Sequence, residues 1–582
     1  MWEIGAARTD ITAIEPGSEM LGWAQPTNRV RTWASRLFSR AIVIHDRSDG
    51  RTIVLATLEV CMIPWNVRDA VLHRIAEHPD GFALEEHDLL IASTHTHSGP
   101  GGFSHDLFYT MTTPGFRERV FETIVDQTVH AILEAWRSRR VGVMRLTQRE
   151  VPLSEPVAFN RSWDAFNANP DAFARVDEDN RDRAVDRRMT LIRFDEPDGT
   201  PIATMNWFAV HCTSVHADNH FLHSDNKGMA ALEIEDHGAS MGQPGYVAVF
   251  AQGAAGDVSP NLRWDPERGR NVGLHDDDFR SAAANGAIQA EHARRLLGEA
   301  RREDIAHGPV DAVLKYVDFH YAPVDAKWVG GVEGRHTGLA RMGMPFLEGT
   351  LEGPGPLLGA RKLTEALTSL VRWQKRRRAR RGSDPDGVLD SHGPMAPFLE
   401  LGRGGEGKAF GAFSMGRPIL PGWFDPTVAE VKRLTKLEAL GGRAWVPHRL
   451  PVQIVRLGTL AIAALPCEPT TMCGMRIERQ LKAALADVGV EHVVVAGYAN
   501  SYASYVTTYE EYQLQRYEGG STLFGQWTLG AYQTAFDDLA TAMHVPADER
   551  RIDPGPRPPA MSDHELDARH PDRIPARSTW FR

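Results

Sequence analysis

Residues 88–102, with the sequence DLLIASTHTHSGPGG, constrain the fold more than any other stretch of the chain. The apolar run 89–92 is typical of a buried strand, and the glycines and proline at 99–102 end it. Because side chains alternate along a strand, His95 and His97 are predicted to share one face. Neutral imidazole is a good zinc ligand, so this pair indicates either a metal site or two hydrogen-bonded core histidines.

Several stretches predict helices and paired strands on either side of this one. Residues 40–45 and 51–58 are apolar and β-branched and flank a turn cluster, which predicts a β-hairpin, and residues 450–465 predict a second hairpin. Residues 116–136 have the apolar spacing of an amphipathic helix, and residues 521–539 also favour a helix. The fold class expected from this order is α/β (mixed α+β), with mixed β-sheets and helices packed outside them.

Composition excludes some partners and locations. The formal net charge of −11 argues against a nucleic-acid partner. No apolar run approaches the roughly 18 residues that a membrane span needs. The opening residues lack the pattern of a signal peptide, so a cytoplasmic location is expected. The four cysteines contain no CxxC pair, which predicts reduced thiols and no thiolate zinc site.

A second group of histidines follows the strand-like run 202–210. His211 stands at the end of that run, which makes it the best further metal candidate. His216, His220 and His223 come next in a polar segment. We interpret these three as part of a water-exposed loop rather than as additional ligands.

Three further polar residues each have two interpretations. Ser259 follows a glycine-rich turn whose backbone N–H groups suit an oxyanion, although a serine before proline is usually a turn former. Glu468 is held extended by Pro469 at a strand exit, where it is either a metal ligand or base, or an exposed turn residue. Arg161 lies in a polar loop, and composition alone favours an exposed arginine there.

Taken in order, the motifs of this chain resemble those of the neutral (non-lysosomal) ceramidase family. They span nearly the whole sequence, and ten such blocks in family order are not expected by chance. The matching blocks are TDIT (9–12), STHTHSGPGG (93–102), FNRS (159–162), NWFAVH with TS (206–214), SDNKG (224–228), GDVSPN (256–261), EGPG (352–355), LPVQIVRLG (450–458), E-x-TT (468–471) and NSYASYVTT-x-EEY-x-x-Q-x-YEG (500–519).

The resemblance implies an amidase that splits the N-acyl bond of ceramide into sphingosine and a fatty acid, with one catalytic Zn²⁺. The positions that match the family's zinc ligands are His95, His211, Glu468 and Tyr505. The positions that match its catalytic residues are Ser259, regarded as the nucleophile, and His97, Arg161 and Tyr517 around the reacting amide.

Two mechanisms follow from these residue types. Either Ser259 attacks and forms an acyl-enzyme, or a zinc-bound hydroxide attacks while Ser259 positions the substrate. In both, His97, Arg161 and Tyr517 donate hydrogen bonds to the oxyanion or protonate the leaving amine, and each such donor typically contributes about 3 kcal/mol.

The resemblance also divides the chain. Residues 1–545 are expected to form a single large catalytic domain with a divergent insertion at about 357–410, and residues 546–582 a Pro-rich tail without the immunoglobulin-like domain of many secreted members. The expected partner is a lipid-like N-acyl substrate, ceramide or an analogue, with no obligate protein partner.

Two alternatives to ceramide hydrolysis remain. One is a zinc amidase or esterase that acts on another N-acyl amine or lipid ester. The other is a non-catalytic protein that binds lipid or a membrane surface. It is motivated by the basic segment within residues 372–381, which predicts either peripheral membrane contact or a solvated helix end.

Overall fold

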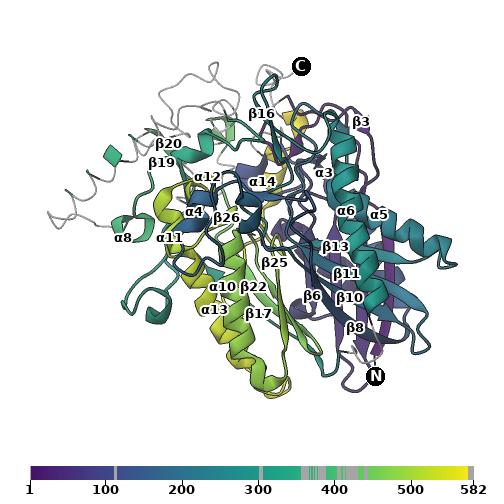
Figure 1. Cartoon of the computed structure of the whole chain (residues 1–582). Helices are drawn as coiled ribbons and strands as arrows, with labels where there is room; N and C mark the ends of the chain where they lie inside the picture. Colours follow the sequence, from purple (N-terminus) through teal and green to yellow (C-terminus); the bar gives the residue numbers. More distant parts are fainter. Residues whose placement is uncertain are drawn as a thin grey trace.

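Two β-sheets lie face to face at the centre of the computed structural model, and helices cover both outer surfaces (Figure 1). The structure describes residues 2–573 without residues 26, 111–114 and 301–305. Between 356 and 442 it describes 388–402 and scattered positions. The predicted insertion at 357–410 and the basic segment 372–381 therefore lie largely outside the described residues.

The larger sheet has eight strands in the order β13-β11-β10-β8-β1-β4-β5-β6. Its β4–β5 pair confirms the predicted hairpin, whereas the β5–β6 and β11–β13 pairs are parallel. The strands are β1 (Trp2–Asp10), β4 (Phe38–Asp46), β5 (Thr52–Leu58), β6 (Leu89–Ser93), β8 (Arg140–Glu150), β10 (Arg188–Asp195), β11 (Pro201–Phe208) and β13 (Val247–Gln252).

The smaller sheet has four strands in the order β17-β22-β23-β25. The second predicted hairpin is confirmed by β22 and β23, which turn at Gly458, where φ is +63° and glycine is favoured. The strands are β17 (Val310–Asp318), β22 (Arg449–Leu457), β23 (Leu460–Ala464) and β25 (His492–Ala496).

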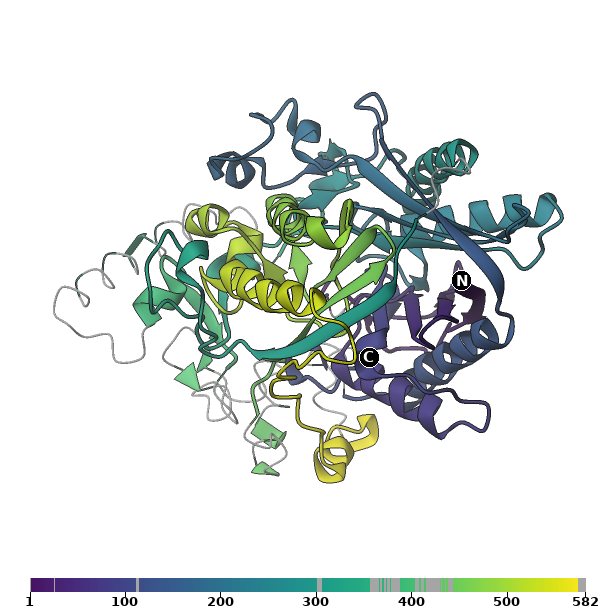
Figure 2. The ribbon, with the colours of Figure 1, turned by 90° about the horizontal axis from the view of Figure 1, so that it is seen from below.

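Alternation of buried side chains along the strands produces four layers. On β4, Ile42 and Ile44 join a core with Val455 and Ile462 of the smaller sheet. The intervening residue, Val43, belongs to a different core. Seen from below, helices therefore flank the paired sheets on both sides (Figure 2). These helices are α3 (Glu118–Arg137), α5 (Asp225–Ser240) and α6 (Asp278–Glu299) on the larger sheet, and α10 (Thr471–Ala484) and α13 (Thr528–Met543) on the smaller one.

Both predicted helices are found, the first within two residues of its expected bounds and the second with a later start. The helix expected at 116–136 is α3, but the helix expected at 521–539 is α13, which begins at Thr528. Residues 521–527 form turns because Gly525 adopts a φ of +94° and the amide of Thr528 donates to its carbonyl. The expected fold class, mixed sheets with helices outside, is confirmed.

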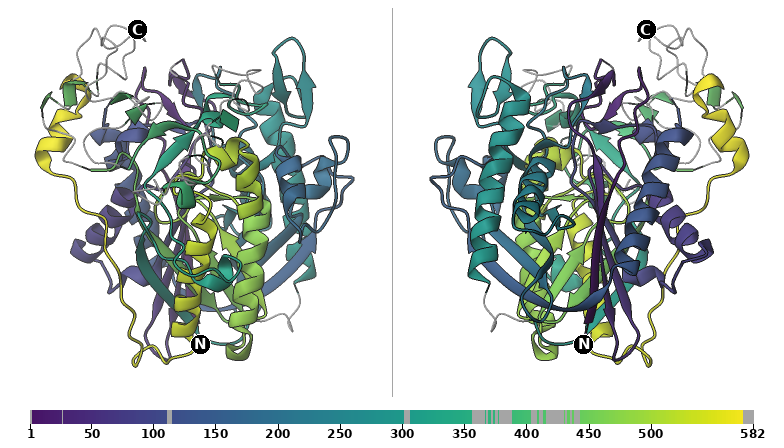
Figure 3. Two further views of the ribbon diagram at one scale, coloured as in Figure 1. Left: turned by 90° about the vertical axis from the view of Figure 1, so that its left-hand side faces the viewer. Right: turned by 90° about the vertical axis from the view of Figure 1, so that its right-hand side faces the viewer.

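The chain after α13 runs along the outside of the molecule towards the end opposite the N-terminus (Figure 3). The carbonyl of Pro554 accepts a hydrogen bond from the amide of Tyr316 (2.7 Å), and that of Arg569 accepts one from Phe116 (2.9 Å). The helix α14 (Asp563–Ala568) lies between these points of attachment. Among the described residues, no helix is long and apolar enough to cross a membrane.

Candidate active site

Loops and short strands at one end of the two sheets bring the predicted site residues together. His95 and His97 follow β6, and His211 follows β11. Glu468 lies in β24 (Glu468–Pro469) directly opposite Tyr505 of β26 (Tyr505–Val506). Because parallel neighbouring strands end at the same edge of a sheet, residues distant in sequence converge there.

Three of these residues aim ligand atoms at one another. His95 Nε2 lies 3.1 Å from His211 Nε2 and 3.4 Å from Glu468 Oε1, and His211 Nε2 lies 3.5 Å from Glu468 Oε2. All three side chains are buried. This is the donor set of a buried His₂-carboxylate metal site.

The hydrogen bonds of the two rings fix what their facing nitrogens offer. His95 Nδ1 lies 2.6 Å from the carbonyl oxygen of Cys61, and His211 Nδ1 lies 2.8 Å from that of Ala255. A carbonyl only accepts, so each Nδ1 carries a proton, and each Nε2 presents a lone pair whenever it holds no second proton. Two lone pairs 3.1 Å apart beside a carboxylate repel one another unless a cation lies between them. The residues present therefore fit a metal ion.

The electrostatics point the same way. Burial disfavours a charged imidazole, yet Glu468 raises the pKa of His95 to about 10 in the metal-free protein. Burial and the neighbouring His95 hold the pKa of His211 well below its usual range. The pocket thus favours one positive charge on the His95 side, which either a proton or a metal ion supplies.

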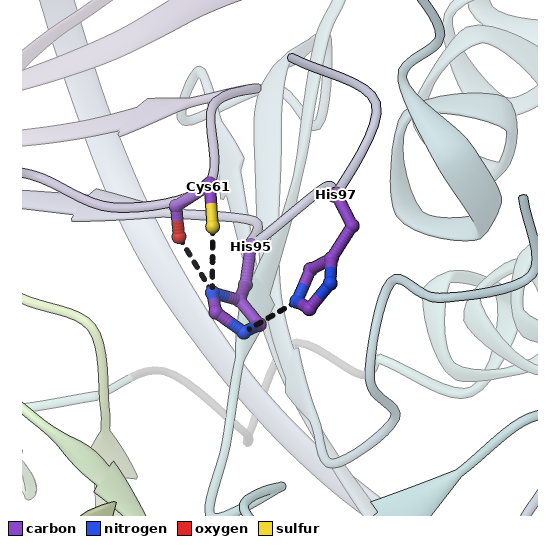
Figure 4. A group of neighbouring side chains, drawn as sticks. All are labelled: Cys61, His95 and His97. Atoms are coloured by element: carbon purple, nitrogen blue, oxygen red, sulfur yellow. Dashed lines mark hydrogen bonds between the residues drawn. The ribbon is translucent and has the colours of Figure 1, made fainter. Parts of the chain in front are cut away.

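Strand alternation does not explain why the two histidines of the HTH motif share a pocket. The strand β6 ends at Ser93, and His95 adopts a φ of +69°, which is rare for a residue other than glycine. In Figure 4 the His95 ring lies between Cys61 and His97, with His97 Nε2 3.0 Å from His95 Nε2. The shared pocket was predicted correctly, but for the wrong reason. The backbone amide of His95 donates to the carbonyl of Val60, and this hydrogen bond holds a turn that brings the two rings together.

Cys61 was not singled out as a site residue. Its sulfur lies 3.7 Å from His95 Nδ1, and its carbonyl orients the same ring (Figure 4). The order of strands in the sheet places Cys61 next to His95. Because β5 and β6 are parallel neighbours, the residues after β5 lie beside those after β6. No sequence spacing reports that pairing.

Arg161 joins the ligand cluster to the predicted nucleophile, and it is buried rather than exposed. Its Nη2 donates to the hydroxyl of Tyr505 (3.2 Å) and its Nη1 to Glu352 (2.6 Å), while Ser259 Oγ donates to the same Glu352 carboxylate. The Arg161 guanidinium lies 5.5 Å from the ring centroid of Tyr517. All eight predicted site residues therefore lie in one connected group, in which Tyr517 is half-buried and the other seven side chains are buried.

Two alternative interpretations are wrong. Glu468 is 2% exposed and is not a turn residue in water. His216 and His223 are buried too, although we expected a water-exposed loop. His216 Nδ1 is hydrogen-bonded to the Asp278 carboxylate (3.0 Å) and its Nε2 to the carbonyl of Asn271 (2.9 Å), so neither ring nitrogen is left for a metal.

A second cluster, Asp318, His320 and His448, does not match a metal site. The two imidazole rings are stacked 4.0 Å apart at an angle of 2°. Lone pairs that lie in parallel planes cannot converge on one ion. Instead, His448 Nδ1 pairs with Asp318 (2.8 Å), while burial and His448 lower the pKa of His320 to about 3.

Glu468 is oriented by two buried phenols. Tyr502 donates to Oε1 and Tyr498 to Oε2 (3.4 Å). Replacing Tyr502 by phenylalanine is expected to weaken metal binding about 10–100-fold, as loss of such outer hydrogen bonds typically does. A competition titration with a metal chelator measures this. Tyr109→Phe is the matched control, because that buried hydroxyl has no hydrogen-bond partner among the described residues. Equal affinities in the two variants would contradict the prediction.

Comparison with known proteins gives one consistent result. The family described as neutral/alkaline non-lysosomal ceramidase, N-terminal, matches residues 2–397 and 433–534. The neutral ceramidase of Pseudomonas aeruginosa is 33% identical over 557 residues, covering 95% of this chain and 74% of that protein. The neutral ceramidase of Mycobacterium tuberculosis is 33% identical over 574 residues, covering 96% and 79%.

Solved structures agree with the sequence comparison. The crystal structure of the Pseudomonas aeruginosa neutral ceramidase matches with a TM-score of 0.76 at 30% identity, covering 96% of this chain and 76% of that one. A ceramidase complexed with C2 matches with a TM-score of 0.78, also at 30% identity, covering 97% and 78%.

Proposed function

The chain belongs to the neutral/alkaline non-lysosomal ceramidase family, and we propose that it hydrolyses the N-acyl bond of ceramide to sphingosine and a fatty acid with one zinc ion. The observation that best supports a bound metal ion is the pair of imidazole Nε2 atoms, 3.1 Å apart, that face each other beside Glu468. The substrate follows from family membership. The non-catalytic alternative is not favoured, because all four positions matching the zinc ligands are present.

His95, His211, Glu468 and Tyr505 would hold the zinc. When bound, zinc polarises a carbonyl and lowers the pKa of a water molecule to about 7. Tyr505 enters this set through its pairing opposite Glu468, and Arg161 donates to its hydroxyl (3.2 Å). Burial and Glu468 raise the pKa of Tyr505, and the charge of Arg161 opposes that rise, so Arg161 favours the phenolate form, which binds a dication best.

The remaining residues supply charge and proton transfer. Arg161 is a buried permanent cation beside Tyr505 and Tyr517, so it stabilises negative charge that develops on the amide oxygen. Burial and the neighbouring His95 keep the pKa of His97 well below its usual range, so its ring is neutral. Its buried Nδ1 has no hydrogen-bond partner among the described residues, which leaves this atom for the substrate.

Aromatic side chains next to the site suit a lipid-like substrate. The ring of Tyr109 lies 5.1 Å from that of Tyr502, and Phe346 stacks on Tyr517 at 6.1 Å. Phe108 extends this group, 6.2 Å from Phe346. Such a surface binds an acyl chain through apolar contact rather than through polar recognition.

Hydrolysis of a fluorescent short-chain ceramide by purified protein, with zinc content measured in parallel, tests the proposal. We expect about one zinc per chain and release of the fatty acid. The variant His95→Ala should lose both, whereas His320→Ala, in the stacked pair outside the site, should keep both. Zinc binding without ceramide turnover, together with turnover of another N-acyl lipid, would show that the substrate assignment is wrong.

A further inference from the structure

A tight loop at residues 348–355 places one acidic side chain inside the site. Gly349 and Pro354 form a β-bridge across it, and the amide of Thr350 donates to the carbonyl of Gly353 (3.0 Å). Leu351 is 40% exposed, but the next residue, Glu352, is 3% exposed. The loop therefore lies at the surface and directs a single carboxylate inwards.

Close packing around the loop holds the Glu352 carboxylate inside the site. A Cβ at Gly353 would lie 2.5 Å from the ring of Trp23, and a Cβ at Gly355 would lie 2.3 Å from the carbonyl of Leu347. The carbonyl of Leu351 also accepts from the amide of Asn271 (2.7 Å). These close contacts fix the loop, and with it the position of Glu352.

The hydrogen bonds around Glu352 define the direction of proton donation. The amide of Asn261 donates to Ser259 Oγ (3.1 Å), so the hydroxyl proton of Ser259 is free to point at Glu352 Oε2. A carboxylate only accepts, so Ser259 must be the donor. The other oxygen of Glu352 pairs with Arg161 Nη1 (2.6 Å), which holds the group in place.

We propose that Glu352 is the general base of the reaction and takes the proton of Ser259 as its Oγ attacks the substrate. This rests on the proposed function. The Oγ–carbon bond forms, the proton passes to Glu352, and the same proton then passes to the amine nitrogen as the carbon–nitrogen bond breaks. A water molecule next attacks the acyl-serine ester, giving its proton to Glu352, which returns it to Oγ as the fatty acid leaves.

Glu518 also pairs with Arg161, but it lies in a different position from Glu352. Glu518 pairs with Arg161 Nε (2.8 Å), but its second oxygen accepts from Ser162 (2.6 Å) and not from Ser259. Both carboxylates are buried. Glu518 is therefore a matched control for the loss of charge beside Arg161.

The surroundings of Glu352 make it a stronger base than an exposed glutamate. Burial raises its pKa, and Arg161 and His216 oppose that rise. Among the described residues, the phenol of Tyr517 also responds to the charge of Glu352. A carboxylate with a raised pKa accepts a hydroxyl proton more readily.

The test compares Glu352→Gln with Glu518→Gln in zinc-loaded protein, on whichever N-acyl lipid the wild type hydrolyses. We expect Glu352→Gln to lower kcat about 10²–10⁴-fold, with KM changed only a few-fold. Zinc content and thermal midpoint should stay near those of the wild type, since glutamine keeps the shape. Glu518→Gln should lose less than about 10-fold, because it removes charge but no proton acceptor.

Two further readouts separate a base from a merely structural carboxylate. Wild-type kcat/KM should fall as pH falls through the pKa of Glu352, and this acid limb should be absent in Glu352→Gln and retained in Glu352→Asp. The double variant Ser259→Ala/Glu352→Gln should be no less active than Ser259→Ala alone, because the two residues act on one proton. Additive losses, or wild-type kcat in Glu352→Gln while His95→Ala is inactive, would overturn the inference and leave the proposed function intact.

Discussion

Replacement of Arg161 by methionine is expected to lower the free energy of unfolding by about 3–5 kcal/mol, because it leaves buried carboxylates without their cation. Glu352 and Glu518 both pair with this guanidinium, at 2.6 and 2.8 Å, and its side chain is 6% exposed. In the variant, the negative charges of both glutamates stay buried without a compensating cation. Denaturant unfolding of wild type and variant, both loaded with zinc, measures the difference.

Activity should fall in the same variant by at least about 10²–10³-fold, the usual cost of one lost donor to an oxyanion. Arg161→Lys is the informative control. It restores a positive charge but not the planar fork that contacts Glu518, Glu352 and the carbonyl of Gly256 at once. We expect lysine to recover part of the stability and little of the activity. A stability within 1 kcal/mol of wild type for Arg161→Met would mean that the two glutamates are protonated or hydrated.

Local patterns were sufficient for the scaffold because its elements are strongly periodic. The hairpin β4–β5 and the helix α3 each follow from residues adjacent in sequence. The start of α13 was missed because Gly525 turns the chain before a segment that propensity alone extends as helix. Sheet order, and hence the pairing of β5 with β6, depends on contacts that no local pattern reports.

The site divides along the same line. His95 and His97 were found from a motif, but the link from Ser259 to its acceptor spans 93 residues and ends on a surface loop. A single buried glutamate between an exposed leucine and a half-buried glycine has no periodicity, so the burial of Glu352 could not be predicted. Arg161 was misread for a similar reason: a loop arginine is usually exposed unless carboxylates distant in sequence surround it.

The second large effect concerns a buried ion cluster outside the site. Arg40 is 3% exposed and lies between Glu59 and Glu235, with its Nε 2.7 Å from Glu235 Oε1. The cluster ties β4 to α5, because Arg40 lies on β4 and Glu235 on α5. Glu235 also accepts a hydrogen bond from the backbone amide of Ala248 on β13 (3.2 Å). Arg40→Met is expected to cost about 3–5 kcal/mol of unfolding free energy, since Glu59 stays buried and loses its cation while Glu235 keeps only its pair with the partly exposed Arg8. Arg36→Met, which breaks an exposed pair with Asp10, should cost less than about 1 kcal/mol.

The pH dependence of Arg40→Met distinguishes lost charge compensation from lost packing. Burial already raises the pKa of Glu59 with Arg40 beside it, and removing Arg40 must raise it further. A carboxyl whose folded pKa exceeds its unfolded value binds more protons in the folded state, so its penalty is relieved as pH falls through the folded pKa. The stability deficit of Arg40→Met relative to wild type should therefore shrink as the pH is lowered from 8 to 5, measured by urea unfolding at each pH. A deficit that is constant over this range would assign the loss to packing of the arginine side chain, because a cavity does not titrate.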